Sequence, residues 1–145
     1  MGLFTSLFSS KVQEQPSGKK EVAIMMGTGN FELEIVWELH YQAALEAICG
    51  PRVPKGVNRL ETAWLILEDN NPHDKNAVRV EIRSKKVGYL SREAAMLYRQ
   101  QLKARGMPKA NGQCQAVIRG GWVSSDGRKG PYSVRLDIPI SRSSN

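Results

Sequence analysis

The side chains with the greatest potential for chemistry are four separated aromatic rings and one short polar loop. The loop spans residues 71–76 and reads Asn-Pro-His-Asp-Lys-Asn. The rings belong to Tyr41, His73, Tyr89 and Trp122. Proteins that hold single-stranded nucleic acid stack flat rings on the bases and place cations beside the phosphates. These residue types therefore favour nucleic-acid binding.

A structural interpretation stays open for each of these residues. The side chains of Asp74 and Asn76 can cap backbone N–H groups inside a rigid turn and contact no ligand. Tyr41 can belong to the core face of a short helix, and Tyr89 can be half-buried in a strand. Trp122 follows two glycines and precedes a polar loop, so either a core or an exposed position suits it.

Patterns typical of enzymes are weak in this sequence. The glycine-rich segment 26–30 lacks the Lys-Ser/Thr pair of a phosphate-binding loop. Ser91 has no candidate base beside it, and the carboxylates are scattered, whereas a metal-dependent nuclease needs them clustered. The two cysteines and two histidines do not have the spacing of zinc ligands. We therefore predict a protein that is not an enzyme and holds no cofactor or metal.

The distribution of charge favours a polyanionic partner. The chain has 145 residues and a formal net charge of +7. Residues 21–81 carry ten acidic and five basic groups, whereas residues 82–129 carry eleven basic groups and two acidic ones. A strongly basic half attracts nucleic acid through its phosphates. The alternative is a solvated surface, rich in Lys and Arg, that only keeps the protein soluble.

The cysteines and the apolar runs bear on the compartment. Cys49 and Cys114 lie far apart, each within an apolar stretch, which is typical of reduced, buried thiols in a cytoplasmic protein. No apolar run is long enough for a transmembrane helix, so we predict no stable insertion into a membrane.

Both ends of the chain are predicted to lie outside the domain, which then spans residues 21–140. Residues 1–20 are expected to form a flexible leader, because residues 9–20 are polar and rich in helix breakers. The start of the leader also fits the loose pattern for N-myristoylation. Its apolar side chains form a candidate docking segment for a partner protein: Leu3, Phe4, Leu7 and Phe8. Residues 141–145 are expected to form a frayed tail.

Short, well punctuated apolar runs predict about six strands. Alternating apolar and polar residues predict half-buried strands at 31–37 and 78–82. The other strands are predicted from similar runs at 60–68, 87–90, 113–123 and 132–140. Trp37 and Trp64 lie within such runs, and we predict both in the core.

Two short helices are predicted between the strands. The first spans residues 41–49 and ends at Gly50. The second spans residues 92–105, with Ser91 as its N-cap, and its core face is expected to include Ala95, Met96, Tyr98 and Leu102. About six strands with two short helices indicate an α+β fold, namely a small OB-like antiparallel β-barrel with a helix covering an open side.

Two linked motifs resemble the HIRAN family. They are Asn71-Pro72-His73-Asp74-Lys75-Asn76-Ala77-Val78 and Val87-Gly88-Tyr89-Leu90-Ser91-Arg92. An upstream segment from His40 to Gly50 fits the opening of the family, and the resemblance covers roughly residues 33–140. HIRAN domains occur at the N-terminus of SWI/SNF-type DNA-repair remodellers and as free-standing bacterial or phage proteins. The resemblance implies an OB-like barrel that binds single-stranded DNA, with a preference for a free 3′-hydroxyl end.

The resemblance also implies roles for single residues. Asp74 matches an acidic residue that can accept a hydrogen bond from the terminal hydroxyl, and Arg92 falls on a basic position that contacts phosphate. Tyr89 falls where some members carry His. His40 and Tyr41 align, more loosely, with an aromatic position that stacks on a base.

Two positions depart from the family pattern. His73 stands where Tyr is usual, and Leu39 stands where the DNA-binding remodeller domains have Arg. These departures keep a second hypothesis open, namely a protein-interaction module on a HIRAN scaffold that does not recognise DNA ends. The complete set of predicted nucleic-acid-binding residues is His40, Tyr41, His73, Asp74, Lys75, Asn76, Tyr89, Arg92 and Trp122.

Overall fold

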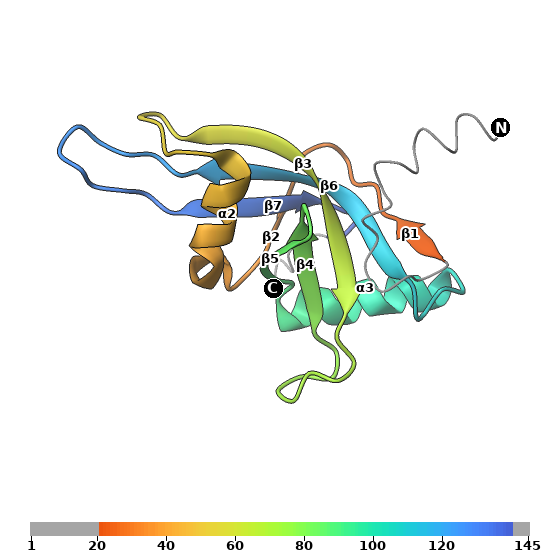
Figure 1. Cartoon of the computed structure of the whole chain (residues 1–145). Helices are drawn as coiled ribbons and strands as arrows, with labels where there is room; N and C mark the ends of the chain where they lie inside the picture. Colours follow the sequence, from red (N-terminus) through yellow and green to blue (C-terminus); the bar gives the residue numbers. More distant parts are fainter. Residues whose placement is uncertain (1–20, 141–145) are drawn as a thin grey trace.

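A computed structural model of the chain describes residues 21–140. The predicted leader, with its apolar docking segment and myristoylation pattern, and the predicted tail lie outside these residues. In chain order the elements are β1 (Val22–Ile24), β2 (Leu33–Glu34), the 3₁₀ helix η2 (Glu38–Tyr41), α2 (Gln42–Cys49), β3 (Val57–Leu67), β4 (Val78–Ile82), β5 (Lys85–Tyr89), α3 (Arg92–Ala104), β6 (Asn111–Gly120) and β7 (Tyr132–Asp137) (Figure 1).

The strands form one curled sheet. Its hydrogen-bonded order is β2-β7-β6-β3-β4-β5 with antiparallel neighbours, and β1 pairs with β6 in parallel outside this path. The long strand β3 pairs with β6 over residues 57–65 and with β4 over residues 63–67. Figure 1 shows β3 running beside β6 and then turning down beside β4. This bend carries the β4–β5 hairpin and the loop 69–77 away from β6 and β7.

The two ends of this strand order meet at one point. Val36, which follows β2, and Tyr89, the last residue of β5, exchange two backbone hydrogen bonds with N···O distances of 2.8 and 2.9 Å. The predicted α+β class is therefore confirmed, with the antiparallel strands curled into a half-barrel and accompanied by two α-helices within residues 21–140.

Helix α3 begins where the sequence predicts. The Ser91 Oγ accepts a hydrogen bond from the N–H of Ala94 at 3.1 Å, which satisfies one of the free N–H groups of the first turn. Its buried face consists of Ala94, Ala95, Tyr98 and Leu102. The prediction for Met96 was wrong, since this side chain is 50% exposed. One residue beyond Ala95 is a rotation of about 100° around the helix, which points Met96 away from the core.

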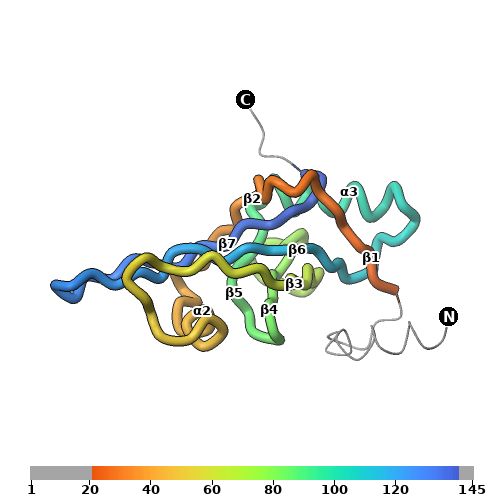
Figure 2. Tube along the Cα trace, turned by 90° about the horizontal axis from the view of Figure 1, so that it is seen from above, coloured from red at the N-terminus to blue at the C-terminus, as the bar shows by residue number. Residues whose placement is uncertain are grey.

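The first helical region differs slightly from its prediction. Tyr41 ends η2, and α2 begins one residue later, with Leu45 and Ile48 buried. Gly50 ends α2 with a φ of +85° while its N–H donates to the Glu46 carbonyl at 2.7 Å. Figures 1 and 2 show α2 and α3 well apart, at different parts of the sheet.

The two tryptophans predicted in the core differ in the exposure of their side chains. Trp64 is buried as predicted, but Trp37 is 60% exposed, so the prediction for Trp37 was wrong. The backbone of Trp37 has a φ of +70° and leads directly into η2. Because Val36 is held by its bridge to Tyr89, the chain turns out of the strand at the next residue.

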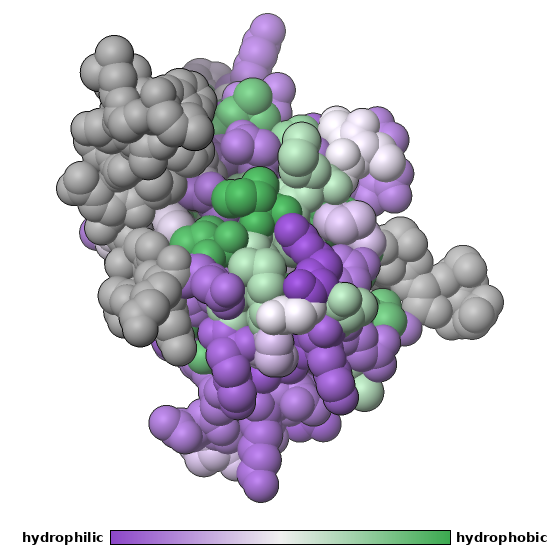
Figure 3. Space-filling model, turned by 90° about the vertical axis from the view of Figure 1, so that its right-hand side faces the viewer, coloured by the Kyte–Doolittle hydropathy of each residue, from purple (hydrophilic) through white to green (hydrophobic). Residues whose placement is uncertain are grey.

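The face of the molecule on the β1 side is mostly hydrophilic (Figure 3). Figure 3 views the molecule from the β1 side and shows a small group of apolar side chains surrounded by polar ones. Neither of the α-helices within residues 21–140 has the length and apolar character needed to cross a membrane.

Candidate nucleic-acid interface

A groove of about 780 Å³ lies between η2, the loop 69–77 and the start of α3. Its walls are formed by Val36, Trp37, His40, Tyr41, Asn71, His73, Asp74, Ala77, Tyr89, Leu90 and Arg92. Six of the nine residues predicted from sequence are among them, namely His40, Tyr41, His73, Asp74, Tyr89 and Arg92. The fold thus brings together residues that are up to 52 positions apart in the chain.

The η2 segment contributes three rings to one side of the groove. The rings of Trp37 and His40 lie with centroids 5.2 Å apart and their planes tilted by 36°. The N–H of His40 donates to the Trp37 carbonyl at 2.9 Å, which fixes the turn between them. Tyr41 follows directly. Sequence reasoning missed Trp37, because the alternation over residues 31–37 assigned its side chain to the core.

The loop 69–77 is held rigid from within. The Asn71 Oδ1 accepts hydrogen bonds from the N–H groups of His73 and Asp74, at 2.8 and 3.1 Å. The Asp74 Oδ1 accepts from the N–H of Asn76 at 2.9 Å. The Asp74 Oδ1 therefore caps a backbone N–H of the turn, as the structural interpretation of Asp74 predicts. Asp74 has a second oxygen, Oδ2, which lies 3.7 Å from the Arg92 Nε.

Arg99 fastens the same loop to α3. Its guanidinium donates to the carbonyls of Asn76 and Ala77, at 2.9 and 3.0 Å, and pairs with Asp69 at 2.8 Å. This contact places His73 and Asp74 beside the first turn of α3. Lys75 and Asn76 are exposed on the outside of the loop and do not line the groove.

A hydrogen-bonded network lies behind the Tyr89 ring. The Tyr89 hydroxyl donates to the Glu68 carboxylate, with distances of 3.0 and 3.1 Å to its two oxygens. The Lys86 Nζ lies 3.3 Å from that hydroxyl and 5.4 and 5.5 Å from the centroids of the Tyr89 and Tyr41 rings. A cation at this range is attracted by the face of each ring. Lys86 therefore helps to fix the position of the Tyr41 and Tyr89 rings relative to each other.

Sequence reasoning did not find Lys86, and the reason is a β-bulge. Residues 86 and 89 lie three apart, so a regular strand would direct them to opposite faces. The register of the β4–β5 hairpin shifts between Val80 and Glu81, so that β5 has one extra residue between Lys86 and Gly88. This extra residue brings Lys86 and Tyr89 to the same side. The local signal for this shift is Gly88, an isolated glycine within the strand.

The ionisation of this network is well defined at neutral pH. Partial burial raises the pKa of Glu68, but hydrogen bonds from Asn71, Arg79 and Tyr89 outweigh burial and hold this pKa below its usual value of 4.5. Burial lowers the pKa of Lys86, but the contacts with Tyr89 outweigh it and the pKa is raised. Glu68 and Lys86 both stay charged, so two opposite charges balance beneath the rings.

Trp122 was predicted in the site and lies elsewhere. It belongs to the connection between β6 and β7, where it forms a bridge with Val53. Its indole lies across Gly130, so closely that a Cβ at that glycine would be 2.0 Å from the Trp122 Nε1. Trp122 does not line the groove.

The predicted basic half does not form one surface. Arg99 is used to hold the loop, Arg83 pairs with Glu61 at 3.0 Å, and Arg105 donates to the Ile24 carbonyl at 3.3 Å. Among the cations that line the groove, Arg92 is 79% exposed and is available to a ligand.

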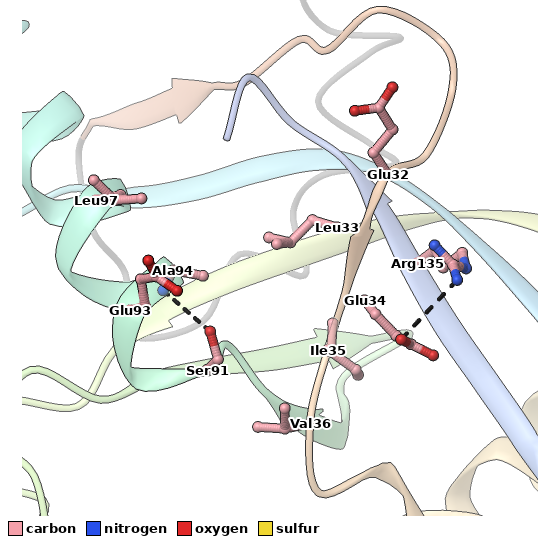
Figure 4. Close-up of a pocket in the computed structure, with 10 residues that line it drawn as sticks. All are labelled: Glu32, Leu33, Glu34, Ile35, Val36, Ser91, Glu93, Ala94, Leu97 and Arg135. Atoms are coloured by element: carbon pink, nitrogen blue, oxygen red, sulfur yellow. Dashed lines mark hydrogen bonds and ion pairs between the residues drawn. The ribbon is translucent and has the colours of Figure 1, made fainter. Parts of the chain in front are cut away.

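A second, smaller pocket of about 300 Å³ lies between β2 and the first turns of α3 (Figure 4). Figure 4 shows Glu32, Glu34 and Glu93 around it, with the Arg135 guanidinium 4.0 Å from the Glu34 carboxylate. An acidic lining repels phosphate, so we assign the candidate interface to the larger groove.

Other chemistry has little support in the described part of the chain. Within residues 21–140 no group of three or more His, Cys, Asp or Glu side chains could hold a metal ion. Cys114 is buried as predicted, whereas Cys49 is only partly buried, and both are free thiols. Burial raises the pKa of both thiols.

Comparison with known proteins adds no relative. No protein-family model, no curated protein and no solved structure matches this chain. The resemblance to the HIRAN family therefore stays a hypothesis that rests on the two motifs and the groove they line.

Proposed function

We propose that this protein binds a terminus of single-stranded nucleic acid, DNA in the first instance, in the groove and performs no catalysis. The observation that supports this proposal is that His40, Tyr41, His73, Asp74, Tyr89 and Arg92 line one groove. We further propose a HIRAN-like, OB-like barrel acting in the cytoplasm, with a role in DNA repair. The Val36–Tyr89 bridge supports the barrel, because it joins the two ends of the strand order.

The geometry suits a chain end for an electrostatic reason. A terminal hydroxyl can donate to the Asp74 Oδ2, whereas a phosphate at the same place would meet a negative carboxylate. Arg92 lies 3.7 Å from Asp74 and is exposed, so it can pair with the phosphate one step before the terminus. The rings of Tyr41 and Tyr89 can stack on bases, each stack contributing about 1–3 kcal/mol.

Fluorescence anisotropy with three labelled probes tests this proposal. The probes are a short single strand with a 3′-hydroxyl, the same strand with a 3′-phosphate, and a duplex without a single-stranded end. We expect the first probe to bind most tightly. No binding of any probe at low salt would reject nucleic-acid binding, and equal affinity for the two single strands would reject the role of Asp74 at the terminus.

Asp74→Asn separates the two roles of this side chain. The amide oxygen can still accept from the N–H of Asn76, so the turn is retained. The negative charge is lost, so we expect the preference for the hydroxyl end over the phosphate end to disappear. A variant that keeps this preference would show that Asp74 only caps the turn.

One observation favours a second function, a protein-interaction module. Trp37 and Leu39 are 60% and 68% exposed at the η2 side of the groove, and exposed apolar side chains at a groove are typical of protein-binding sites. A partner protein that co-purifies in stoichiometric amount, survives nuclease treatment and is lost with Trp37→Ala would support this function against the first.

A further inference from the structure

A hydrogen-bonded arm projects from the sheet at the end opposite β1. It consists of residues 50–59, which lead into β3, and residues 119–131, which connect β6 to β7. Figures 1 and 2 show these segments side by side and extending beyond the other elements. The N–H of Val123 donates to the Val53 carbonyl at 3.1 Å, which ties the two segments together. The arm is therefore an ordered ribbon.

Aromatic packing stiffens this ribbon. The Trp122 indole lies against Gly130, where a Cβ would come within 2.0 Å of the ring nitrogen. The Tyr132 ring lies against Gly121, where a Cβ would be 2.1 Å away. The Arg52 guanidinium lies 4.8 Å from the Tyr132 ring centroid, and its side chain is only 12% exposed. These residues support the shape of the arm.

The arm carries an excess of positive charge. Its two segments contain six basic residues and one acidic residue, Asp126. The basic residues are Arg52, Lys55, Arg59, Arg119, Arg128 and Lys129. Lys55 and Lys129 are exposed and form no hydrogen bond or ion pair within residues 21–140. The single hydrogen bond of the Arg119 side chain there goes to Asn58, at 3.4 Å. At least three cations are therefore free to contact a ligand.

The groove lacks such an excess. Arg92 lines the groove, and the Asp74 carboxylate lies 3.7 Å from it, so this cation of the groove is opposed by a negative charge. A neutral groove can select a terminus but contributes little of the long-range attraction that dominates the affinity for nucleic acid. That attraction has to come from another surface of the same molecule.

We propose that the arm binds the phosphate backbone of the double-stranded nucleic acid that adjoins a terminus held in the groove. This inference rests on the proposed function and names the structure of its ligand, a duplex with a protruding single strand. A duplex carries one charge per about 1.7 Å, roughly twice the density of a single strand. A two-stranded β-ribbon also fits the major groove, which is about 12 Å wide.

The connection between the arm and the groove supports one continuous ligand. The Gln42 Nε2 donates to the carbonyls of Glu38 and Tyr132, both at 3.0 Å. This side chain therefore fixes the base of the arm to η2, which lines the groove. Helix α2 has eight residues and spans about 12 Å at 1.5 Å per residue, so a few nucleotides are enough to pass from one surface to the other.

The test compares two double variants with the same change of charge. Lys55→Gln with Lys129→Gln neutralises the arm, and Lys85→Gln with Lys103→Gln removes two exposed lysines from the β4–β5 hairpin and the last turn of α3. Each protein is titrated with a short single strand, with a duplex carrying that strand as a 3′ overhang, and with a closed dumbbell duplex that has no end. Titrations at several salt concentrations give the slope of log K against log salt.

We expect the arm variant to lose affinity for the overhang duplex and for the dumbbell duplex, and its binding of the short strand to stay unchanged. Each lost phosphate contact reduces the slope by about 0.9, which is about eightfold in affinity at 0.1 M salt. The control variant should bind all three probes like the unaltered protein. An arm variant whose slope and affinity for the overhang duplex are unaltered would overturn the inference, as would equal losses in both variants.

The failure of the proposed function gives a different result. In that case the short strand does not bind to the unaltered protein, whatever the arm does. The unaltered protein and the arm variant are also titrated with vesicles that contain phosphatidylserine. If the arm variant loses binding to these vesicles and keeps its affinity for the overhang duplex, the arm is a membrane-binding surface and the inference is wrong.

Discussion

The groove and the arm both gather side chains suited to nucleic acid, but the polar groups of the two regions are used differently. In the groove, the functional side chains are held by other parts of the protein: Asp74 caps a turn, and Tyr89 donates to Glu68. In the arm, Lys55 and Lys129 have no partner within the described residues 21–140. A preorganised neutral site can discriminate between chain ends, whereas unpaired cations on an extended ribbon supply attraction that any phosphate satisfies. Selectivity and affinity would then be properties of separate surfaces.

The largest expected effect comes from the ring at the centre of the groove. Tyr89→Ala removes one stacking surface, and we expect a loss of about 1–3 kcal/mol in binding of the short single strand, about fivefold to more than a hundredfold. The slope of affinity against salt should stay unchanged, because the arm is intact. Anisotropy titration measures both quantities.

Tyr89→Phe is the matched control for this change. It keeps the ring and removes the hydroxyl that donates to Glu68, so we expect a smaller loss of affinity for the short single strand than in Tyr89→Ala, because the stacking surface is retained. If Tyr89→Ala binds the single strand as well as the unaltered protein does, the groove is not the binding surface and the comparison with the arm has no basis.

The next effect concerns the position of the loop 69–77. Arg99→Ala removes a guanidinium that holds two carbonyls of the loop and Asp69. We expect the free energy of unfolding to fall by about 1.5–3 kcal/mol, the range for hydrogen bonds to a charged group. Hydrogen exchange of the amides of Asn76 and Ala77 should accelerate. Lys103→Ala on the same helix should change neither quantity, and equal effects of the two variants would show that the loop is positioned in another way.

The groove should also respond to acid through Glu68. Its pKa in the folded protein is lowered below the usual 4.5, so its stabilising contribution is complete above about pH 4.5 and is lost as the pH falls through the folded-state value. Glu68→Gln should cost about 1–2 kcal/mol at pH 7, with the difference from the unaltered protein shrinking below pH 4.5. Urea unfolding at several pH values measures this difference, and a constant difference would show that the charge of Glu68 does not matter.

The smallest effect is expected at the tip of the arm. Hydrogen bonds from Ser124 and Arg128 lower the pKa of Asp126, and the ion pair with Arg128 has a distance of 3.0 Å. Asp126→Asn should release Arg128 and raise the affinity for the overhang duplex by less than about fivefold, since exposed ion pairs are weak. Binding of the short single strand should not change. A decrease in duplex affinity would show that the tip of the arm does not bind the duplex through attraction of its phosphates.

The parts of the structure that were predicted correctly depend on local chemistry. Ser91 as an N-cap and the length of α3 follow from residues next to one another. The clustering of His73, Asp74, Tyr89 and Arg92 followed from the family resemblance, not from periodicity.

The parts that were missed depend on pairing between distant strands. Trp37 is exposed because Val36 bonds to Tyr89, and Lys86 contacts the Tyr89 hydroxyl because of a bulge in β5. Trp122 lies outside the groove because the β6–β7 connection extends the sheet at its other end. The pairing of Val36 and the β6–β7 connection leave no signal in the neighbouring residues, whereas the bulge is marked by Gly88.

Gly88 limits which substitutions this protein can accept as its sequence evolves. A Cβ at this position would lie 2.6 Å from the Val36 carbonyl oxygen and 2.7 Å from the Ile35 Cδ1, so a larger residue would push apart the bridge beside the Tyr89 ring. Descendants of this chain that retain the groove are therefore expected to keep glycine before the ring, while lineages under different selection can remodel the arm freely. The recognition surface would be inherited as a unit with its backbone, and the charged ribbon would be the part that adapts to new ligands.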